Sequence, residues 1–234
     1  MTDVALRENI DRVRGKIDLA AHRTGRCGEE IVLVAVTKGV PSDRVEEAIE
    51  AGLAIFGENR IQEAREKIER VRRPAAWHLV GHLQSNKANA AATLFQMIHS
   101  LDSAALARRL DGACAGRPDP LDVLVQVNVS GETTKSGLRP ENLRQALEQI
   151  ALCPNLRVRG LMTIPPPDPD PGKSRPHFAW LRLLAEEAHG WAIPGVRLDH
   201  LSMGMSDDFP VAIEEGATMI RIGRAIFGER IGSR

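Results

Sequence analysis

The sequence lacks an excess of charge of either sign, because its 31 lysine and arginine side chains are matched by 31 aspartate and glutamate side chains. No overall field therefore attracts nucleic acid or an anionic membrane surface. An uninterrupted apolar run of about 18 residues, the length that a membrane-spanning helix needs, is also missing. We expect a small-molecule ligand, with neither a nucleic-acid nor a membrane partner.

Cysteine is scarce as well. Cys27, Cys114 and Cys153 are odd in number, widely spaced and form no C-x-x-C pair, which argues against a disulfide framework and against a zinc site. The charged N-terminal segment has no apolar core of the kind found in secretory signal peptides. These features favour a reduced, cytoplasmic location and no bound metal.

Short apolar segments alternate with segments of helical periodicity along the chain. The predicted strands are residues 31–37, 53–57, 77–81, 96–100, 122–129, 157–163, 197–202 and 218–223. The predicted helices are residues 4–21, 42–51, 61–72, 86–94, 103–115, 140–152, 176–189 and 207–215.

Strict alternation of strands and helices implies parallel strands with right-handed crossovers, and eight strands close a (β/α)8 barrel. A doubly wound open sheet is the competing fold. The barrel is favoured because no G-x-G-x-x-G follows the first strand and because polar residues follow many strands. We predict a single α/β domain over residues 1–234, a TIM barrel with an extra N-terminal helix and no second β-rich domain. The proline-rich residues 165–176 are predicted to form a stiff, solvated loop.

Lys38 follows the first predicted strand, at the strand end where barrels of this kind collect their chemistry. If Val34 and Val36 point into the barrel, strand alternation directs Lys38 there too. Partial desolvation beside other cations depresses the pKa of an amine and makes it nucleophilic toward an aldehyde. An arbitrary lysine is usually just exposed, so the partners of Lys38 decide between the two interpretations.

The last predicted strand offers such a partner. Alternation places Met219, Arg221 and Gly223 on the inner side, and Ile220 and Ile222 against the helices. A buried guanidinium needs a carboxylate or another polar ligand, so Arg221 indicates a binding site.

The loops after strands seven and eight form the usual phosphate station of such barrels. Ser206 offers a hydroxyl there, and Gly223 permits close approach of the backbone. Alternatively, Ser206 only caps the helix that begins at Asp207 and Asp208. Those two carboxylates would repel a phosphate if they faced it.

A reactive lysine opposite a phosphate cradle suggests pyridoxal phosphate. Lys135, which also follows a strand, is the best rival for a covalent bond to a carbonyl, as in a class I aldolase. The histidines in or just after strands have no metal-binding spacing, so we interpret them as packed or rim residues; they are His78, His82, His99 and His200.

Several segments, in order from about residue 4 to residue 230, resemble the YggS/PROSC family of pyridoxal phosphate homeostasis proteins. The segments are Val34-Ala-Val-Thr-Lys38, Phe56-Gly-Glu-Asn59, Trp77-His-Leu-Val-Gly-His-Leu-Gln-Ser-Asn-Lys87, Gly160-Leu-Met-Thr163, Leu201-Ser-Met-Gly-Met-Ser206, Ile220-Arg-Ile-Gly223 and Ile226-Phe-Gly228. That family resembles the barrel domain of alanine racemase without its second domain.

The resemblance implies a role for nine residues. Lys38 would form the internal aldimine, Arg221 would face the pyridine nitrogen, and Ser206 with the backbone of Gly223 and Arg224 would hold the phosphate. The remaining residues would line the cofactor: Asn59, Met162, Ser202 and Met203. Two positions depart from the family, since Arg224 replaces a common serine or threonine and Arg60 replaces a common tyrosine.

The resemblance also implies a carrier of pyridoxal 5'-phosphate that stores and delivers the cofactor without appreciable catalysis. An arginine donor leaves the ring nitrogen unprotonated and weakens the electron sink. A chain without tyrosine cannot supply the tyrosine that alanine racemases use on the second face of the substrate. The alternative is a pyridoxal phosphate-dependent amino-acid racemase. As partners we expect the cofactor and, transiently, apo-enzymes that receive it, and we expect a monomer.

Overall fold

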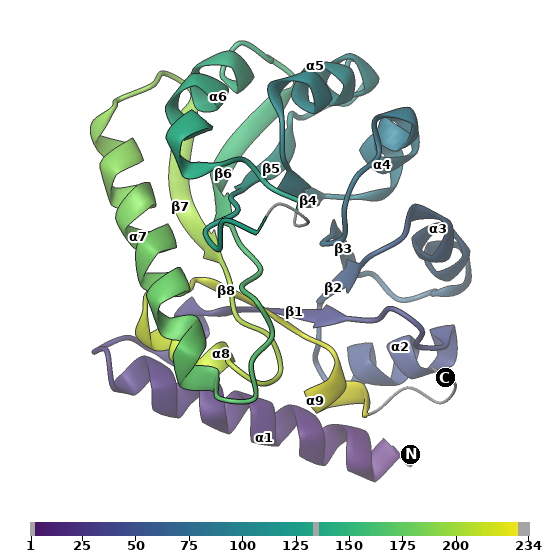
Figure 1. Ribbon diagram of the computed structural model, residues 1–234. Coiled ribbons are helices and arrows are strands. Elements are labelled where there is room, and N and C mark those ends of the chain that lie inside the picture. Colours follow the sequence, from purple (N-terminus) through teal and green to yellow (C-terminus); the bar gives the residue numbers. More distant parts are fainter. Residues whose placement is uncertain (1–2, 133–135, 229–234) are drawn as a thin grey trace.

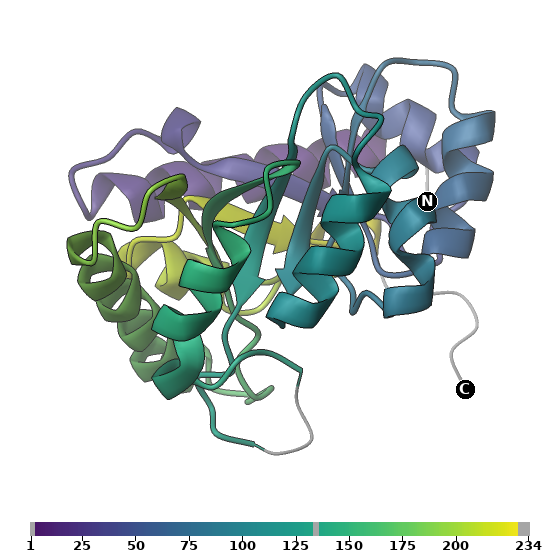
Figure 2. The ribbon, with the colours of Figure 1, turned by 90° about the horizontal axis from the view of Figure 1, so that it is seen from above.

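Eight parallel strands form a closed barrel in the order β1 to β8 in a computed structural model that describes residues 3–132 and 136–228. Figures 1 and 2 show the helices on the outside of the strands. The strands are β1 (Val32–Val36), β2 (Ile55–Glu58), β3 (Ala76–Leu79), β4 (Met97–Leu101), β5 (Leu121–Gln126), β6 (Leu156–Met162), β7 (Val196–Ser202) and β8 (Met219–Ile222). The predicted (β/α)8 barrel is confirmed, and the open sheet is not.

The helices follow the predicted segments closely. They are α1 (Asp3–His22), α2 (Ser42–Glu50), α3 (Ile61–Arg70), α4 (Ala88–Leu94), α5 (Ala104–Ala113), α6 (Leu143–Ile150), α7 (Arg175–Gly190), α8 (Phe209–Glu214) and α9 (Arg224–Phe227). Short 3-10 helices are η1 (Gly28–Glu30), η2 (Ser85–Lys87), η3 (Pro140–Asn142) and η4 (Pro171–Ser174).

Besides the 3-10 helix η1, two helical segments were not predicted. The last turn, α9, has only four residues, too few for a periodic pattern to be recognised. The other is η4, which occupies part of the proline-rich segment and runs directly into α7. The prediction of a continuous loop over residues 165–176 is therefore wrong at its C-terminal end, because proline is well suited to the first turn of a helix.

The strands direct their side chains alternately to the interior and to the helices. Val32, Met97, Leu124, Met162 and Met219 come from five strands and pack together inside the barrel. Ile220 and Ile222 belong instead to the large apolar layer between strands and helices. The predicted alternation on β8 is thereby confirmed, which places Arg221 on the inner side.

The N-terminal helix α1 lies along α8 and α9, as Figure 1 shows. Leu6, Ile10, Val13 and Ile17 recur every three or four residues and are all buried. This stripe packs into the same apolar layer as the barrel helices.

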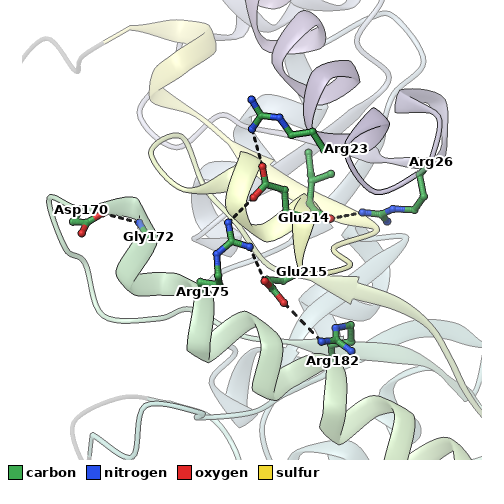
Figure 3. Close-up of polar contacts among 9 residues, drawn as sticks. Arg23, Arg26, Asp170, Gly172, Arg175, Arg182, Glu214 and Glu215 are labelled. Carbon is green, nitrogen blue, oxygen red and sulfur yellow. Dashed lines mark hydrogen bonds and ion pairs between the residues drawn. The ribbon is translucent and has the colours of Figure 1, made fainter.

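Charged side chains link α1 and α7 to the end of α8 (Figure 3). Arg23 and Arg175 both contact Glu214, at 2.8 and 2.5 Å, and Arg175 also contacts Glu215 at 2.7 Å. Hydrogen bonds from Arg175 and Arg23 lower the pKa of Glu214. A single exposed ion pair contributes little to stability, but these pairs together join the end of α1 and the start of α7 to the end of α8. Helix α8 in turn follows the loop after β7.

Of the helices that the structure describes, none is both long and apolar enough to cross a membrane.

Gly160 lets β6 and β7 approach closely. A β-carbon at this position would lie 1.9 Å from the carbonyl oxygen of His200, and the strand register is irregular between Val158 and Gly160. The neighbouring atom belongs to backbone, so a side chain here cannot be accommodated by a change of rotamer.

Gly160→Ala should therefore lower the free energy of unfolding by about 1–3 kcal/mol, because the added methyl group overpacks two paired strands. Gly112→Ala in α5 is the matched control, since no atom lies within 4 Å of a β-carbon there. This control should raise stability by roughly 0.5 kcal/mol through the better helix propensity of alanine. Urea unfolding of both variants measures the difference, and equal stabilities would contradict the packing argument.

Candidate functional site

A cavity of about 510 Å³ opens at the carboxyl ends of the strands. This is the end of a parallel barrel at which ligand sites form, and the volume suits a small molecule. The lining residues belong to β1, β8 and α9 and to the segments that follow β1, β2, β3, β6, β7 and β8; they are Val36, Lys38, Val40, Asn59, Val80, Ile164, Met205, Ser206, Asp207, Arg221, Gly223, Arg224, Phe227 and Gly228.

Lys38 lies in a tight turn directly after β1. The amide of Val40 donates to the carbonyl of Thr37 at 2.9 Å, and Gly39 has a φ of 73°, which glycine adopts without strain. Val36 and Lys38 both line the cavity, whereas Thr37 is fully buried on the opposite side. The predicted inward direction of Lys38 is confirmed.

Arg221 also lines the cavity and is almost fully buried, with 4% of its surface exposed. Its guanidinium donates to the Ser202 hydroxyl at 2.6 Å and to the Thr163 carbonyl at 2.9 Å. Burial lowers the pKa of Arg221 to about 10, although the carboxylate of Asp208 opposes this shift. The group stays protonated at neutral pH with two neutral partners, so its positive charge is available to a polar ligand.

Ser202 connects Arg221 to two buried histidines. The Ser202 hydroxyl lies 2.9 Å from Nδ1 of His99, and Nε2 of His99 lies 3.0 Å from Nδ1 of His78. Burial lowers the pKa of His78 to about 4 and that of His99 well below its ordinary value. Both imidazoles are thus neutral. Their packed position agrees with the interpretation from the sequence, and they hold the serine that contacts the guanidinium.

The three residues proposed for phosphate binding also line the cavity. Ser206 accepts a hydrogen bond from the amide of Ala225 in the first turn of α9, at 3.2 Å. A β-carbon on Gly223 would lie 3.1 Å from the Val36 carbonyl oxygen, a tight contact, so this glycine leaves room where the chain after β8 passes β1. Arg224 is exposed and pairs with Asp207.

The helix after Ser206 is not capped by that residue. Helix α8 begins at Phe209 with Asp208 at its N-cap, so the alternative interpretation, that Ser206 only caps this helix, is wrong. Asp208 is buried, where it accepts hydrogen bonds from the Met205 amide at 2.7 Å and the Ser174 hydroxyl at 3.0 Å. Of the two carboxylates that would repel a phosphate, Asp208 is therefore buried in structural hydrogen bonds and is not among the lining residues. Asp207 does line the cavity.

The structure brings six of the nine predicted residues to this cavity: Lys38, Asn59, Ser206, Arg221, Gly223 and Arg224. Ser202 lies behind Arg221. Met162 belongs to the apolar cluster inside the barrel, and Met203 packs in the layer between strands and helices. Adjacent residues of a strand end face opposite sides, which separates Met203 from Ser202.

Several lining residues were not predicted, although the sequence carried a signal for some of them. Val36 has the same parity as Lys38 on the first strand, and Phe227 lies in the segment 226–228 that resembles the family. Met205 lies in the segment 201–206, which also resembles the family, whereas Ile164 lies in a loop whose path no periodicity reveals. Lys135, the rival amine, lies outside the described residues.

The family model described as alanine racemase, N-terminal domain matches residues 4–231. A Pseudomonas aeruginosa protein named pyridoxal phosphate homeostasis protein is 47% identical over 225 residues, which cover 95% of each chain. The Aquifex aeolicus protein of the same name is 43% identical over 224 residues, which cover 95% of this chain and 97% of that protein.

Two solved structures have the same fold as this chain. PipY of Synechococcus elongatus with PLP bound has a TM-score of 0.84 and 37% identity, covering 95% of this chain and 100% of PipY. Alanine racemase of Clostridium difficile shares the fold, with a TM-score of 0.75 at 13% identity, and the match covers 98% of this chain and 58% of the racemase. The chain therefore belongs to the alanine racemase N-terminal domain family and, within it, to the YggS/PROSC group of pyridoxal phosphate homeostasis proteins.

Proposed function

We propose that this protein binds pyridoxal 5'-phosphate reversibly through Lys38 and serves to store and deliver the cofactor inside the cell. The observation that carries the proposal is that a primary amine, Lys38, and a buried guanidinium, Arg221, line one cavity at the carboxyl ends of the strands. The names of the relatives and the PLP bound to PipY support the same ligand.

The residues of the cavity fit the groups of this ligand. The Lys38 amine condenses with an aldehyde: a carbon–nitrogen double bond forms, and the aldehyde oxygen leaves as water with the two hydrogens of the amine. Arg221 offers a donor to a ring nitrogen, and Asn59 offers an amide to a ring substituent. Ser206, Gly223 and Arg224 supply a hydroxyl, backbone and a cation for a phosphate.

Three further residues support the site in this proposal without lining the cavity. Ser202 orients Arg221, to which it is hydrogen-bonded at 2.6 Å. Met162 is fully buried in the apolar cluster inside the barrel, and Met203 is fully buried between the strands and the helices, so in this proposal both act only through packing. We assign all nine residues to one site within a single domain that spans residues 1–234.

The same cavity is poorly suited to catalysis on amino acids. Arg221 remains a cation, so it does not protonate a ring nitrogen in the way that a carboxylic acid does, and the electron sink is weak. The chain contains no tyrosine, so the second acid–base group of alanine racemases has no counterpart. We therefore infer a binding protein with little or no turnover.

The setting of the protein follows from the same features. The three cysteines are unpaired, which supports a reducing cytoplasm. A carrier needs recipients, so transient contacts with apo-enzymes belong to the proposal, and we propose that the carrier is a monomer.

Borohydride trapping tests the covalent bond. After incubation with pyridoxal 5'-phosphate, reduction and digestion, mass spectrometry should find the added pyridoxyl group on the peptide that contains Lys38. Lys38→Met should reduce the trapped product to background, whereas Lys16→Met on the exposed face of α1 should leave it unchanged. A pyridoxyl group on a peptide without Lys38 would refute the assignment.

Hydrogen exchange at the α-carbon tests the absence of catalysis. Protein loaded with pyridoxal 5'-phosphate and mixed with α-deuterated alanine or serine should release deuterium no faster than the free cofactor does, because a second acid–base group is missing. Proton NMR follows the exchange. Release at catalytic rates would instead establish the racemase alternative.

Asp207 competes with a phosphate for Arg224 in this proposal. Asp207→Asn removes a carboxylate from the cavity lining and should tighten binding of pyridoxal 5'-phosphate about two- to fivefold, the range expected for an exposed charge pair. Absorbance titration measures the affinity. Pyridoxal without the phosphate should show no gain, and Asp11→Asn on α1 controls for net charge. A gain for both ligands would place the phosphate elsewhere.

A further inference from the structure

A buried lysine of α3, Lys67, lies behind the turn that carries Lys38. Its side chain is only 7% exposed, although lysine is rarely buried unless it is paired. The ammonium donates to Glu58 Oε1 at 2.6 Å and to Glu63 Oε1 at 2.7 Å. It also donates to the carbonyl oxygen of Thr37. An ammonium has three donors, so all of them are used.

Glu58 makes this arrangement costly for stability. It ends β2 with no exposed surface, and its Oε1 also accepts a hydrogen bond from the Thr37 hydroxyl at 2.6 Å. Its other oxygen, Oε2, is buried without a hydrogen-bond partner among the described residues. Burial raises the pKa of Glu58, while Lys67 and Thr37 oppose the shift. Apolar residues of similar volume often stabilise a core as well as buried ion pairs do, so stability alone does not account for these charges.

The charges hold the backbone on both sides of Lys38. The Thr37 carbonyl, which accepts from Lys67, belongs to the peptide group before Lys38. The Gly39 amide, which donates to Glu63, belongs to the peptide group after it. Two peptide planes define the φ and ψ angles of the residue between them, so fixing both planes fixes the direction in which the Lys38 side chain leaves the backbone.

We propose that Lys67 is a positioning residue for Lys38: together with Glu58 and Glu63, it holds the turn after β1 so that the Lys38 amine enters the cavity. Lys67 is not among the residues that line the cavity, so it acts through the backbone of Thr37 and Gly39. This inference rests on the proposed function, since the amine that it positions is the one that bonds the aldehyde.

The test compares variants of the full chain. Lys67→Met removes the ammonium but leaves Glu58 buried and unpaired, which threatens folding. The double variant Glu58→Gln/Lys67→Met removes both charges and keeps the fold accessible. Leu110→Ala, in the buried face of α5, is the control for a loss of stability away from the site.

Two measurements are made on each variant. Stopped-flow absorbance gives the rate at which added pyridoxal 5'-phosphate bonds to the protein, and amide hydrogen exchange reports on Gly39 without any ligand. In the Lys67 variants we expect the bonding rate to fall at least about tenfold, because a misdirected nucleophile loses effective concentration. Exchange of the Gly39 amide should be faster. Leu110→Ala should keep the wild-type bonding rate although its melting temperature falls.

Wild-type bonding rates in both Lys67 variants would overturn the inference and leave Lys67 with a structural role only. Failure of the proposed function looks different, because the wild-type protein itself would then form no bond with pyridoxal 5'-phosphate. In that case the Gly39 exchange still decides whether Lys67 holds the turn: unchanged exchange in the variants would overturn the inference, and faster exchange would support it.

Discussion

The pairing of β8 with β1 is the interaction on which the rest of the structure depends. It closes the barrel and sets Arg221 beside Val34, so that the first and last strands of the chain contribute to one cavity. Lys38 follows the same strand as Val34 and shares its parity. Gly223 allows the close approach, because a side chain there would press on the Val36 carbonyl. Without this closure the amine and the guanidinium would have no common ligand.

Inside the closed barrel a chain of hydrogen bonds through Ser202 and His99 holds the buried guanidinium of Arg221. Arg221 is desolvated, and a hydroxyl and a carbonyl satisfy part of its hydrogen-bonding capacity. The serine in turn is held by neutral His99, and below this layer methionines fill the interior. The guanidinium is thus fixed in place by neutral partners, and no carboxylate within residues 3–132 and 136–228 forms an ion pair with it.

The two arginines that line the cavity have different surroundings. Arg221 has rigid, buried partners, whereas Arg224 is exposed and pairs with Asp207, which also lines the cavity. Bound pyridoxal 5'-phosphate would therefore have the preformed cation of Arg221 near its ring and the competing carboxylate of Asp207 near its phosphate. That difference suits a protein that must release its ligand as well as hold it, since an exposed ion pair can exchange partners at little cost.

The sequence by itself determined the barrel, because eight apolar segments alternate with amphipathic ones, and strand alternation was enough to turn Lys38 and Arg221 inward. The same alternation, continued one residue past the end of β7, places Met203 on the opposite side of the barrel wall from Ser202. Other features were decided only by the tertiary structure: Ser206 contacts α9 instead of capping α8, and Lys67 reaches the backbone beside Lys38. Periodicity records which face of its own element a residue occupies, whereas contacts between loops and buried charges from different elements depend on how the closed barrel brings distant segments together.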